Sequence, residues 1–520
     1  MSGPRVVVIG AGVGGLTAAA LLLKQGWQVT VLEAATYPGG CAGTFFHKGY
    51  RFDAGATLAG GFDASGPHTR VAEMLDLRWD VSPTDPAWVV HLPDRSVTQW
   101  ADPVRWRAER QAHFPNTESF WRLQERLADL TWDIASRDFP FPPANFREAL
   151  RLPLSLRAKT LGGLPHLLRK FRALLPPNTD AAFKAFIDAQ LLISAQAISD
   201  HANALYGATV LDLPRRGVVH VHRGMGGIAE TLVDWIRAHG GEVKYRQKVE
   251  RIEVRHGRAV AVHTGRGLRL EADAFLANVT PWGLRDLLGP DAPAALQRET
   301  RTRPDMWGAA VLHVGLDAGI VDTPITHHQV IMDVHCPLGE GNSVFISLSP
   351  LDDPSRAPAG MRTATLSTHT SARAWHDLLA RDPQAYAAQK AHYADQMLAA
   401  AERALPGFRR AAHLVLPGTP VTYAFYTRRP LGMVGGFPQV SLLAARSPRT
   451  GIPNLWLVGD SIFPGQSTAG VTLGALRVAR LVQDSGLGRR TLFRGADVPR
   501  AVSPAPIPIK NETRRMRCIF

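Results

Sequence analysis

Three glycines near the start of the chain have the spacing of a dinucleotide-binding loop. Gly10, Gly12 and Gly15 form a G-x-G-x-x-G motif in "VVVIGAGVGGLTAAALL". The first glycine of such a motif allows a tight turn, the second lets a pyrophosphate approach the backbone, and the third lets helix and strand pack closely. The helix that follows offers free N–H groups and a partial positive charge to phosphates. The pattern therefore predicts a bound dinucleotide.

An acidic residue stands where such a dinucleotide would place its ribose. Glu33 ends the second predicted strand, "WQVTVLE", at about the distance from the glycines at which a carboxylate accepts hydrogen bonds from ribose hydroxyls. The same carboxylate would repel the 2′-phosphate of NADP. NAD and FAD both remain compatible with this half of the pattern.

The segment "LWLVGDSIFPGQSTAGVTLGAL", residues 455–476, favours FAD. It indicates a strand ending at Gly459–Asp460, a loop, and a helix that begins near Gly470. In flavoproteins of the glutathione-reductase type, an Asp after such a strand bonds the ribitol chain. The next helix there directs its positive N-terminus at the flavin pyrimidine, where negative charge collects on reduction. NAD-dependent dehydrogenases have no use for this second pattern.

The elements that must position these residues occur in three separate parts of the chain. The first is a βαβ unit over about residues 5–34. The middle part predicts an amphipathic helix, a β-hairpin turned at His256–Gly257, and a buried strand in "ADAFLANVTP". We therefore predict an α/β fold in which residues 1–80, 216–300 and 440–485 form an FAD-binding Rossmann domain of the glutathione-reductase type. Residues 81–215 and 301–439 would form an inserted mixed α/β substrate domain with a helical, membrane-contacting part, and residues 486–520 a basic, disordered tail.

Composition excludes several classes of protein. The chain has 520 residues, a net charge of +14 and no motif for nucleic acid, so no nucleic-acid partner is predicted. It has no run of about 18 uncharged apolar residues and no segment typical of a signal peptide, so we expect a cytoplasmic protein. Its three cysteines, Cys41, Cys336 and Cys518, are scattered, which disfavours disulfides and zinc sites. His220 and His222 have no carboxylate or cysteine at metal spacing, and no metal is predicted.

A basic, apolar stretch suggests a use for the positive charge. Residues 147–172 hold seven Lys or Arg and one acid, with leucine, proline and phenylalanine between them, as in "LPLSLRAKTLGGLPHLLRKFRALL". Near anionic lipid each such cation contributes about 1 kcal/mol. We predict peripheral association with an anionic membrane surface. The alternative is an ordinary solvated helix face.

These motifs together resemble the carotenoid desaturase family of flavoproteins, over about residues 5–485. The resemblance rests on the segments quoted above and on "PGGCAGTF", "GYRFDAGAT" and "RGMGGIAETLVDWIRAHGGEV". Most phytoene desaturases and amine oxidases have G-G-R where this chain has Gly39–Gly40–Cys41. The G-G-C form, with "DPVRWRAERQAHFP" and "YTRRPLGMVGGFPQ", is similar to the branch of retinol saturases and carotenoid 3′,4′-desaturases, and most similar to the latter.

The resemblance implies an FAD cofactor and a set of residues that contact it. Gly10, Gly12, Gly14 and Gly15 would hold the pyrophosphate and Glu33 the adenosine ribose. The remaining implied contacts are Gly40 and Cys41 along the pyrophosphate and ribitol, Val249 at the adenine, Asp460 at the ribitol, and Gly470, Val471 and Thr472 near the flavin ring. Because Cys41 replaces the arginine of G-G-R, this chain lacks one possible phosphate partner of the family. Cys41 could be a redox-active thiol, but without a C-x-x-C partner a small packing residue is the expected role.

The implied activity is the introduction of a C=C bond, at the 3′,4′ position, into an acyclic carotenoid end group with or without a 1′-hydroxyl. Flavin N5 would take the hydride, oxygen or a quinone would reoxidise the flavin, and no catalytic residue can be named. An apolar tunnel would present one C–C bond of a carotenoid delivered from lipid. A phytoene-type desaturase, a carotenoid ketolase and a retinol-type saturase are alternatives within the family. A flavin-free lipid-escort protein of the same fold is the alternative outside enzymes, and the intact glycine motif, Glu33 and Asp460 argue against it.

Overall fold

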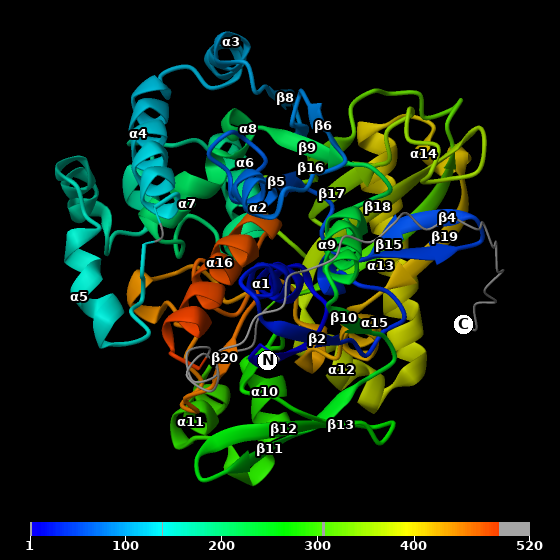
Figure 1. The fold of residues 1–520 in the computed structure, drawn as a ribbon. Coiled ribbons are helices and arrows are strands. Elements are labelled where there is room, and N and C mark those ends of the chain that lie inside the picture. The colour runs from blue at the N-terminus through cyan, green and yellow to red at the C-terminus, as the bar shows by residue number, and fades with distance from the viewer. Residues whose placement is uncertain (1–2, 138, 304–306, 488–520) are drawn as a thin grey trace.

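The computed structural model describes residues 3–137, 139–303 and 307–487 (Figure 1). All the candidate site residues named above lie within these ranges. The predicted basic tail, residues 486–520, lies almost entirely outside them.

A five-stranded parallel sheet forms the centre of the nucleotide-binding half. Its strand order is β10-β2-β1-β14-β20, and Val8 of β1 pairs with Val31 of β2 and Leu276 of β14. Since both faces of a parallel sheet are covered, its strands are nearly continuous apolar runs. The strands are β1 (Arg5–Ile9), β2 (Gln28–Leu32), β10 (Glu242–Lys244), β14 (Ala274–Ala277) and β20 (Leu455–Leu457). They come from the three parts of the chain assigned above to the FAD-binding domain, while the domain boundaries stay a prediction.

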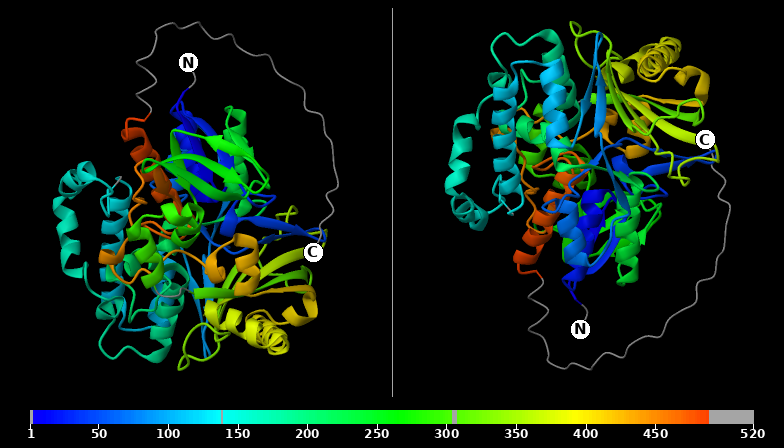
Figure 2. Two further views of the ribbon diagram at one scale, coloured as in Figure 1. Left: turned by 90° about the horizontal axis from the view of Figure 1, so that it is seen from below. Right: turned by 90° about the horizontal axis from the view of Figure 1, so that it is seen from above.

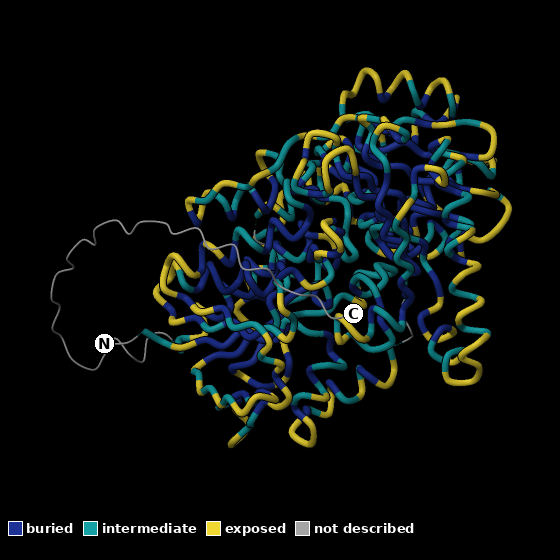
Figure 3. The backbone as a smooth tube through the Cα atoms, turned by 90° about the vertical axis from the view of Figure 1, so that its right-hand side faces the viewer, coloured by how far each residue is buried: buried dark blue, intermediate teal, exposed yellow. Residues whose placement is uncertain are grey.

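Helices α1 (Val13–Lys24), α9 (Gly226–Ala238) and α16 (Thr468–Asp484) pack beside this sheet, with α1 in contact with both of the others (Figure 1). A three-stranded antiparallel sheet of β11 (Val249–Arg255), β12 (Arg258–Thr264) and β13 (Arg269–Glu271) packs on the same core. The β11–β12 hairpin turns at His256–Gly257, as the sequence predicted. Figure 3 shows buried backbone concentrated in the interior and exposed backbone at the periphery.

A mixed seven-stranded sheet forms the second half of the molecule. Its order is β19-β15-β18-β17-β16-β7-β8, and helix α13 (Pro383–Ala404) packs on it. The neighbouring strands β7 and β8, at one end of this order, come from the first insertion, so both insertions contribute to one sheet. The strands are β7 (Trp88–His91), β8 (Ser96–Gln99), β15 (Trp307–Asp317), β16 (His327–Ile331), β17 (Ser343–Leu348), β18 (Met361–Ser371) and β19 (Ala412–Gly418).

A helical layer lies on the opposite side of the molecule from α13 (Figure 2). It contains α4 (Glu118–Ala135), α5 (Phe146–Leu154), the 3₁₀ segment η2 (Ala158–His166), α6 (Ala181–Ala195) and α7 (Ala204–Leu211). Asn145 caps α5 by accepting from the Glu148 amide, and Asn203 caps α7 by accepting from the Leu205 amide. Within the described ranges, no helix has the length and apolar character needed to cross a membrane.

Candidate active site

The glycine loop between β1 and α1 leaves its backbone open to a ligand. Gly10 has φ +96°, a left-handed conformation that glycine adopts without a steric penalty. Gly12 is the N-cap of α1, and among the described residues no side chain caps the helix there. A Cβ on Gly15 would lie 2.6 Å from the carbonyl oxygen of Gly10. The loop therefore requires glycine, and it presents free helix N–H groups of the kind that bind phosphate.

Glu33 lies directly beside this loop. Its Oε2 accepts from the Ala11 amide at 2.7 Å and its Oε1 from the Ala35 amide at 2.7 Å. Each carboxylate oxygen retains a further lone pair, which a ribose hydroxyl could use. The Gln247 amide donates to the Glu33 carbonyl oxygen at 2.8 Å, so the start of β11, with Val249, lies at the same edge of the sheet.

The beginnings of α1 and α16 meet at one point. A Cβ on Gly14 would lie 3.0 Å from Gly459 Cα and 3.5 Å from Val471 Cβ. Ser467 caps α16 by accepting from the Gly470 amide at 3.0 Å. Thr472 is fully buried, and its hydroxyl has no hydrogen-bond partner among the described residues. A buried hydroxyl normally has a partner, so this atom fits a site that receives an additional group.

Asn278 connects these parts, although no role could be assigned to it from the sequence. It directly follows β14 at the carboxyl edge of the sheet. With its amide oriented to satisfy both groups, its oxygen accepts from the Gly12 amide at 3.0 Å and its nitrogen donates to the Val458 carbonyl at 3.3 Å. The only signal in the sequence was the position of an amide side chain at the end of a buried parallel strand.

Gly40 and Cys41 border the glycine loop from the other side. The Gly39 amide donates to the Ala11 carbonyl at 2.8 Å, and a Cβ on Gly40 would lie 3.7 Å from Gly12 Cα. Burial raises the pKa of the Cys41 thiol, and the nearby Arg429 guanidinium opposes this shift only in part. The thiol is therefore protonated near neutral pH, which is unlike the reactive thiolates of redox sites.

One set of histidines has a partner that was not expected. We found no carboxylate near His220 and His222 in the sequence, but the structure places Asp353 Oδ2 3.0 Å from His220 Nε2. The same carboxylate accepts from the Arg223 amide at 3.0 Å and from the Ser355 hydroxyl. Hydrogen bonds thus account for the buried Asp353 without an ion, and the absence of a metal stays a prediction.

The glycine loop, Glu33 and the start of α16 lie together at one edge of the parallel sheet, and a family comparison identifies the class of the protein. The model of the flavin-containing amine oxidoreductases matches residues 13–483. The chain belongs to this family. Its cofactor is FAD, as the sequence predicted.

Similar curated proteins act on carotenoids. Prolycopene isomerase of Daucus carota is 29% identical over 93% of this chain and 81% of its own length. The neurosporene-forming phytoene desaturase of Rhodobacter capsulatus is 25% identical over 92% of this chain and 94% of its own. The 4,4′-diapolycopene oxygenase of a Methylomonas species is 25% identical over 92% of this chain and 98% of its own length. The predicted resemblance to the carotenoid desaturase family is confirmed.

Solved structures confirm the predicted fold class of this flavin oxidoreductase. An oxidoreductase from Methanosarcina mazei superposes with a TM-score of 0.60 at 17% identity, covering 92% of this chain and all of that one. Putrescine oxidase bound to putrescine superposes with a TM-score of 0.59 at 18% identity, covering 92% of this chain and 99% of that one. The predicted membrane-contacting part of the fold stays a prediction.

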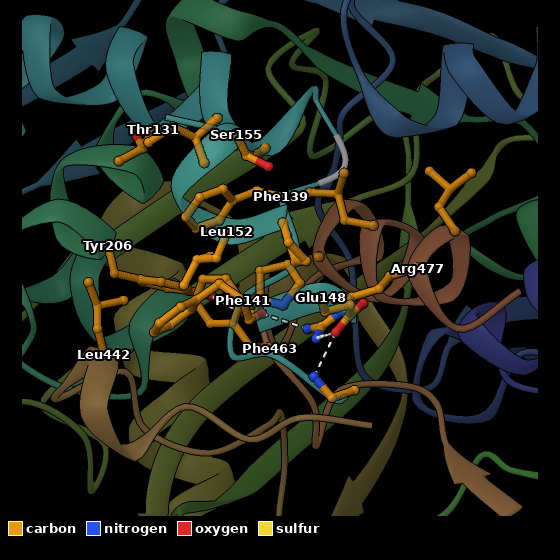
Figure 4. Close-up of a pocket in the computed structure, with 18 of the residues that line it drawn as sticks. Thr131, Phe139, Phe141, Glu148, Leu152, Ser155, Tyr206, Leu442, Phe463 and Arg477 are labelled. Carbon is orange, nitrogen blue, oxygen red and sulfur yellow. Dashed lines mark hydrogen bonds and ion pairs between the residues drawn. The ribbon is translucent and has the colours of Figure 1, made fainter. Parts of the chain in front are cut away.

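A cavity of about 1120 Å³ begins at the N-terminus of α16 in this oxidoreductase. The buried residues Gly60 and Thr468 to Gly470 line its inner end, and it continues between α16, α4, α5 and α7 (Figure 4). It exceeds the about 300–1,000 Å³ of common small-molecule sites. Phe146 and Leu168, which line its outer end, are 77% and 70% exposed. The cavity therefore leads from the surface to the start of the helix predicted to face the flavin.

The cavity wall is largely apolar, and the polar side chains of Glu148, Arg477 and Tyr206 in it have hydrogen-bond partners. Figure 4 shows the rings of Phe139, Phe141 and Phe463 together on one side and Glu148 beside Arg477 on another. Glu148 Oε2 and Arg477 Nη2 lie 2.6 Å apart, and both side chains are 11% exposed. Burial raises the pKa of Tyr206, whose hydroxyl donates to the Pro464 carbonyl at 3.0 Å. Such a wall suits a long apolar ligand.

The described residues of this wall offer no free general base. Their two carboxylates, Glu148 and Asp484, pair with Arg477 and Arg151 respectively. Neither lies among the residues at the α16 N-terminus. The catalytic residue, which could not be named from the sequence, is not supplied by this part of the structure.

Proposed function

We propose that the FAD of this oxidoreductase is held by the residues that its sequence motifs imply. The free N–H groups of the α1 start would bind the pyrophosphate, Glu33 would accept from the adenosine ribose, and Asp460 from the ribitol. Gly40, Cys41 and the backbone of Val249 would line the dinucleotide. The uncapped helix start, the remaining lone pairs of Glu33 and the unpartnered Thr472 hydroxyl support this arrangement.

We propose further that the enzyme is a carotenoid desaturase acting at the 3′,4′ position of an acyclic end group, with or without a 1′-hydroxyl. The observation that carries this proposal is the large apolar cavity that ends at the α16 N-terminus. Bound FAD would supply a hydride acceptor at N5. The chain's own part would be to exclude water and to hold one C–C bond of the polyene at that end. Oxygen or a quinone would take the electrons.

Isomerisation of a polycis carotenoid is a second candidate. Four prolycopene isomerases are 28–29% identical to this chain, while the phytoene desaturases and dehydrogenase are 24–26% identical. The same cavity would serve both reactions, because each needs one segment of a polyene placed at the flavin.

Pigment analysis of a carotenoid-producing host carrying this chain separates these functions. We expect products that have lost two hydrogen atoms and absorb further to the red, and we expect them to be missing with an Asp460→Ala variant. Products of unchanged mass but altered chromatographic retention would establish the isomerase instead.

Other outcomes would contradict the desaturase proposal in different ways. Products that have gained two hydrogen atoms would identify a saturase, and products that have gained oxygen a ketolase. No change with any acyclic carotenoid, together with colourless purified protein, would indicate the flavin-free escort protein.

We propose that the outer end of the cavity docks on an anionic membrane. Several apolar side chains of α5, η2 and the residues beside them are exposed, with Leu154 at 83%. Basic residues lie between them, which is the composition of an interfacial segment. We call this the docking surface; its exposed apolar members are Phe146, Leu150, Leu154, Leu156, Leu161, Leu164 and Leu168. A carotenoid could then pass from lipid into an equally apolar cavity without entering water.

Replacing Leu154 and Leu168 with serine is expected to weaken binding to anionic vesicles by at least about tenfold. Inserting a leucine side chain into lipid contributes about 1.5–3 kcal/mol when burial is complete. Co-sedimentation with vesicles of phosphatidylcholine and phosphatidylglycerol measures the change. Phe425→Ser is the matched control, since Phe425 is also exposed, at 61%, but lies in α15 (Pro420–Thr427) outside this surface. Equal binding by the double variant and wild type would refute the docking surface.

A further inference from the structure

Arg429 is a largely buried cation that joins two loops beside the FAD site. Its side chain is 13% exposed. Its Nη1 donates to Asp460 Oδ2 at 2.9 Å, its Nε to the Met433 carbonyl at 2.8 Å, and its Nη2 to the Gly435 carbonyl at 2.6 Å. One guanidinium thus binds the carboxylate that follows β20 and the backbone of residues 433–435.

These two loops are in tight contact. A Cβ on Gly436 would lie 2.1 Å from the Asp460 carbonyl oxygen, and the Gly436 amide donates to Gln466 Oε1 at 3.3 Å. The loop of residues 433–436 therefore lies against the whole turn from Asp460 to Gln466, which leads into α16. A shift of either loop would move Asp460 relative to the start of that helix.

Arg429 also places a positive charge near Cys41, the position at which this chain lacks the arginine of the G-G-R motif. Its guanidinium lies near enough to Cys41 to act electrostatically on the thiol and to lower its pKa, against the larger effect of burial. Cys41 stands at the arginine position of the G-G-R motif to which its segment was compared above. A guanidinium therefore lies beside this position, although it comes from a distant part of the chain.

Asp460 has one oxygen to spare for a ligand. Its Oδ2 is bound by Arg429, while among the residues that the structure describes its Oδ1 accepts only a long hydrogen bond, 3.4 Å, from the Ser461 hydroxyl. Without Arg429, the carboxylate of this partly buried residue would lose its counter-charge and would be free to turn. A planar guanidinium that also bonds two backbone carbonyls fixes a carboxylate better than a lone ammonium does.

We propose that Arg429 is the positioning residue of the FAD site: it orients the Asp460 carboxylate so that Oδ1 accepts from the ribityl chain, and it fixes the 433–436 loop against that carboxylate. Arg429 acts through Asp460 and not by touching the reacting atoms. The proposal rests on FAD as the cofactor and is independent of which carotenoid is bound.

A double-mutant cycle on FAD affinity tests this role. Arg429→Gln and Asp460→Asn are made singly and together, and FAD binding to each apoprotein is followed by flavin fluorescence without any carotenoid. We expect each single variant to bind FAD at least tenfold more weakly and the double variant to be no weaker than the worse single variant. Arg429→Lys should fall between wild type and Arg429→Gln. Additive effects, or wild-type affinity in Arg429→Gln, would overturn the proposal.

Thermal melts separate positioning from simple loop support. If Arg429 only stabilises the loop, Arg429→Gln will lower the melting temperature of the apoprotein while the increase caused by saturating FAD stays as in wild type, and the proposal fails. We expect the FAD-induced increase itself to shrink. Arg428→Gln is the matched control, since its side chain lies over the exposed Phe425 ring, and it should bind FAD as wild type does. If Arg429→Gln does not fold, Arg429→Lys replaces it in the cycle under the same criterion.

Discussion

Replacing Gly14 with valine is expected to yield a folded protein that purifies without flavin. A Cβ at this position would lie 3.0 Å from Gly459 Cα and 3.2 Å from the Gly459 nitrogen. Both are backbone atoms, so no side chain can move aside to relieve the contact, and valine adds two further methyl groups. The beginnings of α1 and α16 must then separate, and with them the groups proposed to hold the pyrophosphate and the ribitol.

The stability change should be smaller than the loss of binding. Overpacking of this kind costs about 1–3 kcal/mol, which a chain of this size can tolerate. The measurements are the flavin absorbance per mole of protein and the melting temperature of the apoprotein. Gly162→Val is the control, because a Cβ at Gly162 meets nothing within 4 Å. If Gly14→Val retains FAD at wild-type affinity, the junction of α1 and α16 is not the binding edge.

The parts of this site that could be predicted are those governed by local chemistry. The glycine spacing, the strand that precedes it and the acid at Glu33 are all constraints within one βαβ unit, so reading about thirty residues was sufficient. The hairpin at His256–Gly257 is likewise local, since turn residues between alternating apolar runs determine it. A matching pattern at the far end of the chain then identified the cofactor.

The parts that could not be predicted depend on contacts between distant segments. Asn278 reaches the Gly12 amide, Arg429 reaches Asp460, and Asp353 reaches His220, in each case across a large sequence separation. Residue type and spacing carry no information about such distances. Arg429 even stands in a segment that was recognised as a family marker, but nothing in that segment indicates which carboxylate its guanidinium meets.

In the helical insertion, too, the sequence alone could not predict which apolar residues fill the core and which line the cavity. The apolar residues of α4 could have lined a tunnel or filled a core, and the structure uses them for both. Phe120, Trp121 and Leu127 are buried in the core, whereas Leu130 and Ile134, near the end of the same helix, line the cavity. The apolar stripe of a helix does not indicate which of its residues pack against a neighbouring element and which line a cavity.

Replacing Leu473 with tryptophan is expected to abolish carotenoid turnover while FAD binding stays normal. Leu473 lies on the second turn of α16, lines the cavity and is only partly buried, so the larger side chain can extend into the cavity without disturbing the core. Displacing a substrate by about 1 Å can reduce the rate about a hundredfold, and an indole in this position would exclude the polyene from the flavin end.

Turnover and flavin content must be measured on the same preparation. A blocked tunnel is identified only when turnover is lost while the flavin content stays normal. A variant that lost both would have damaged α16, which the Gly14→Val experiment already addresses. Leu473→Ala supplies the opposite change at the same position: it widens the cavity and should keep measurable turnover and a full complement of FAD. If Leu473→Trp converts carotenoid at the wild-type rate, the substrate reaches the flavin by a path that avoids this helix, and the cavity proposed to hold it has another use.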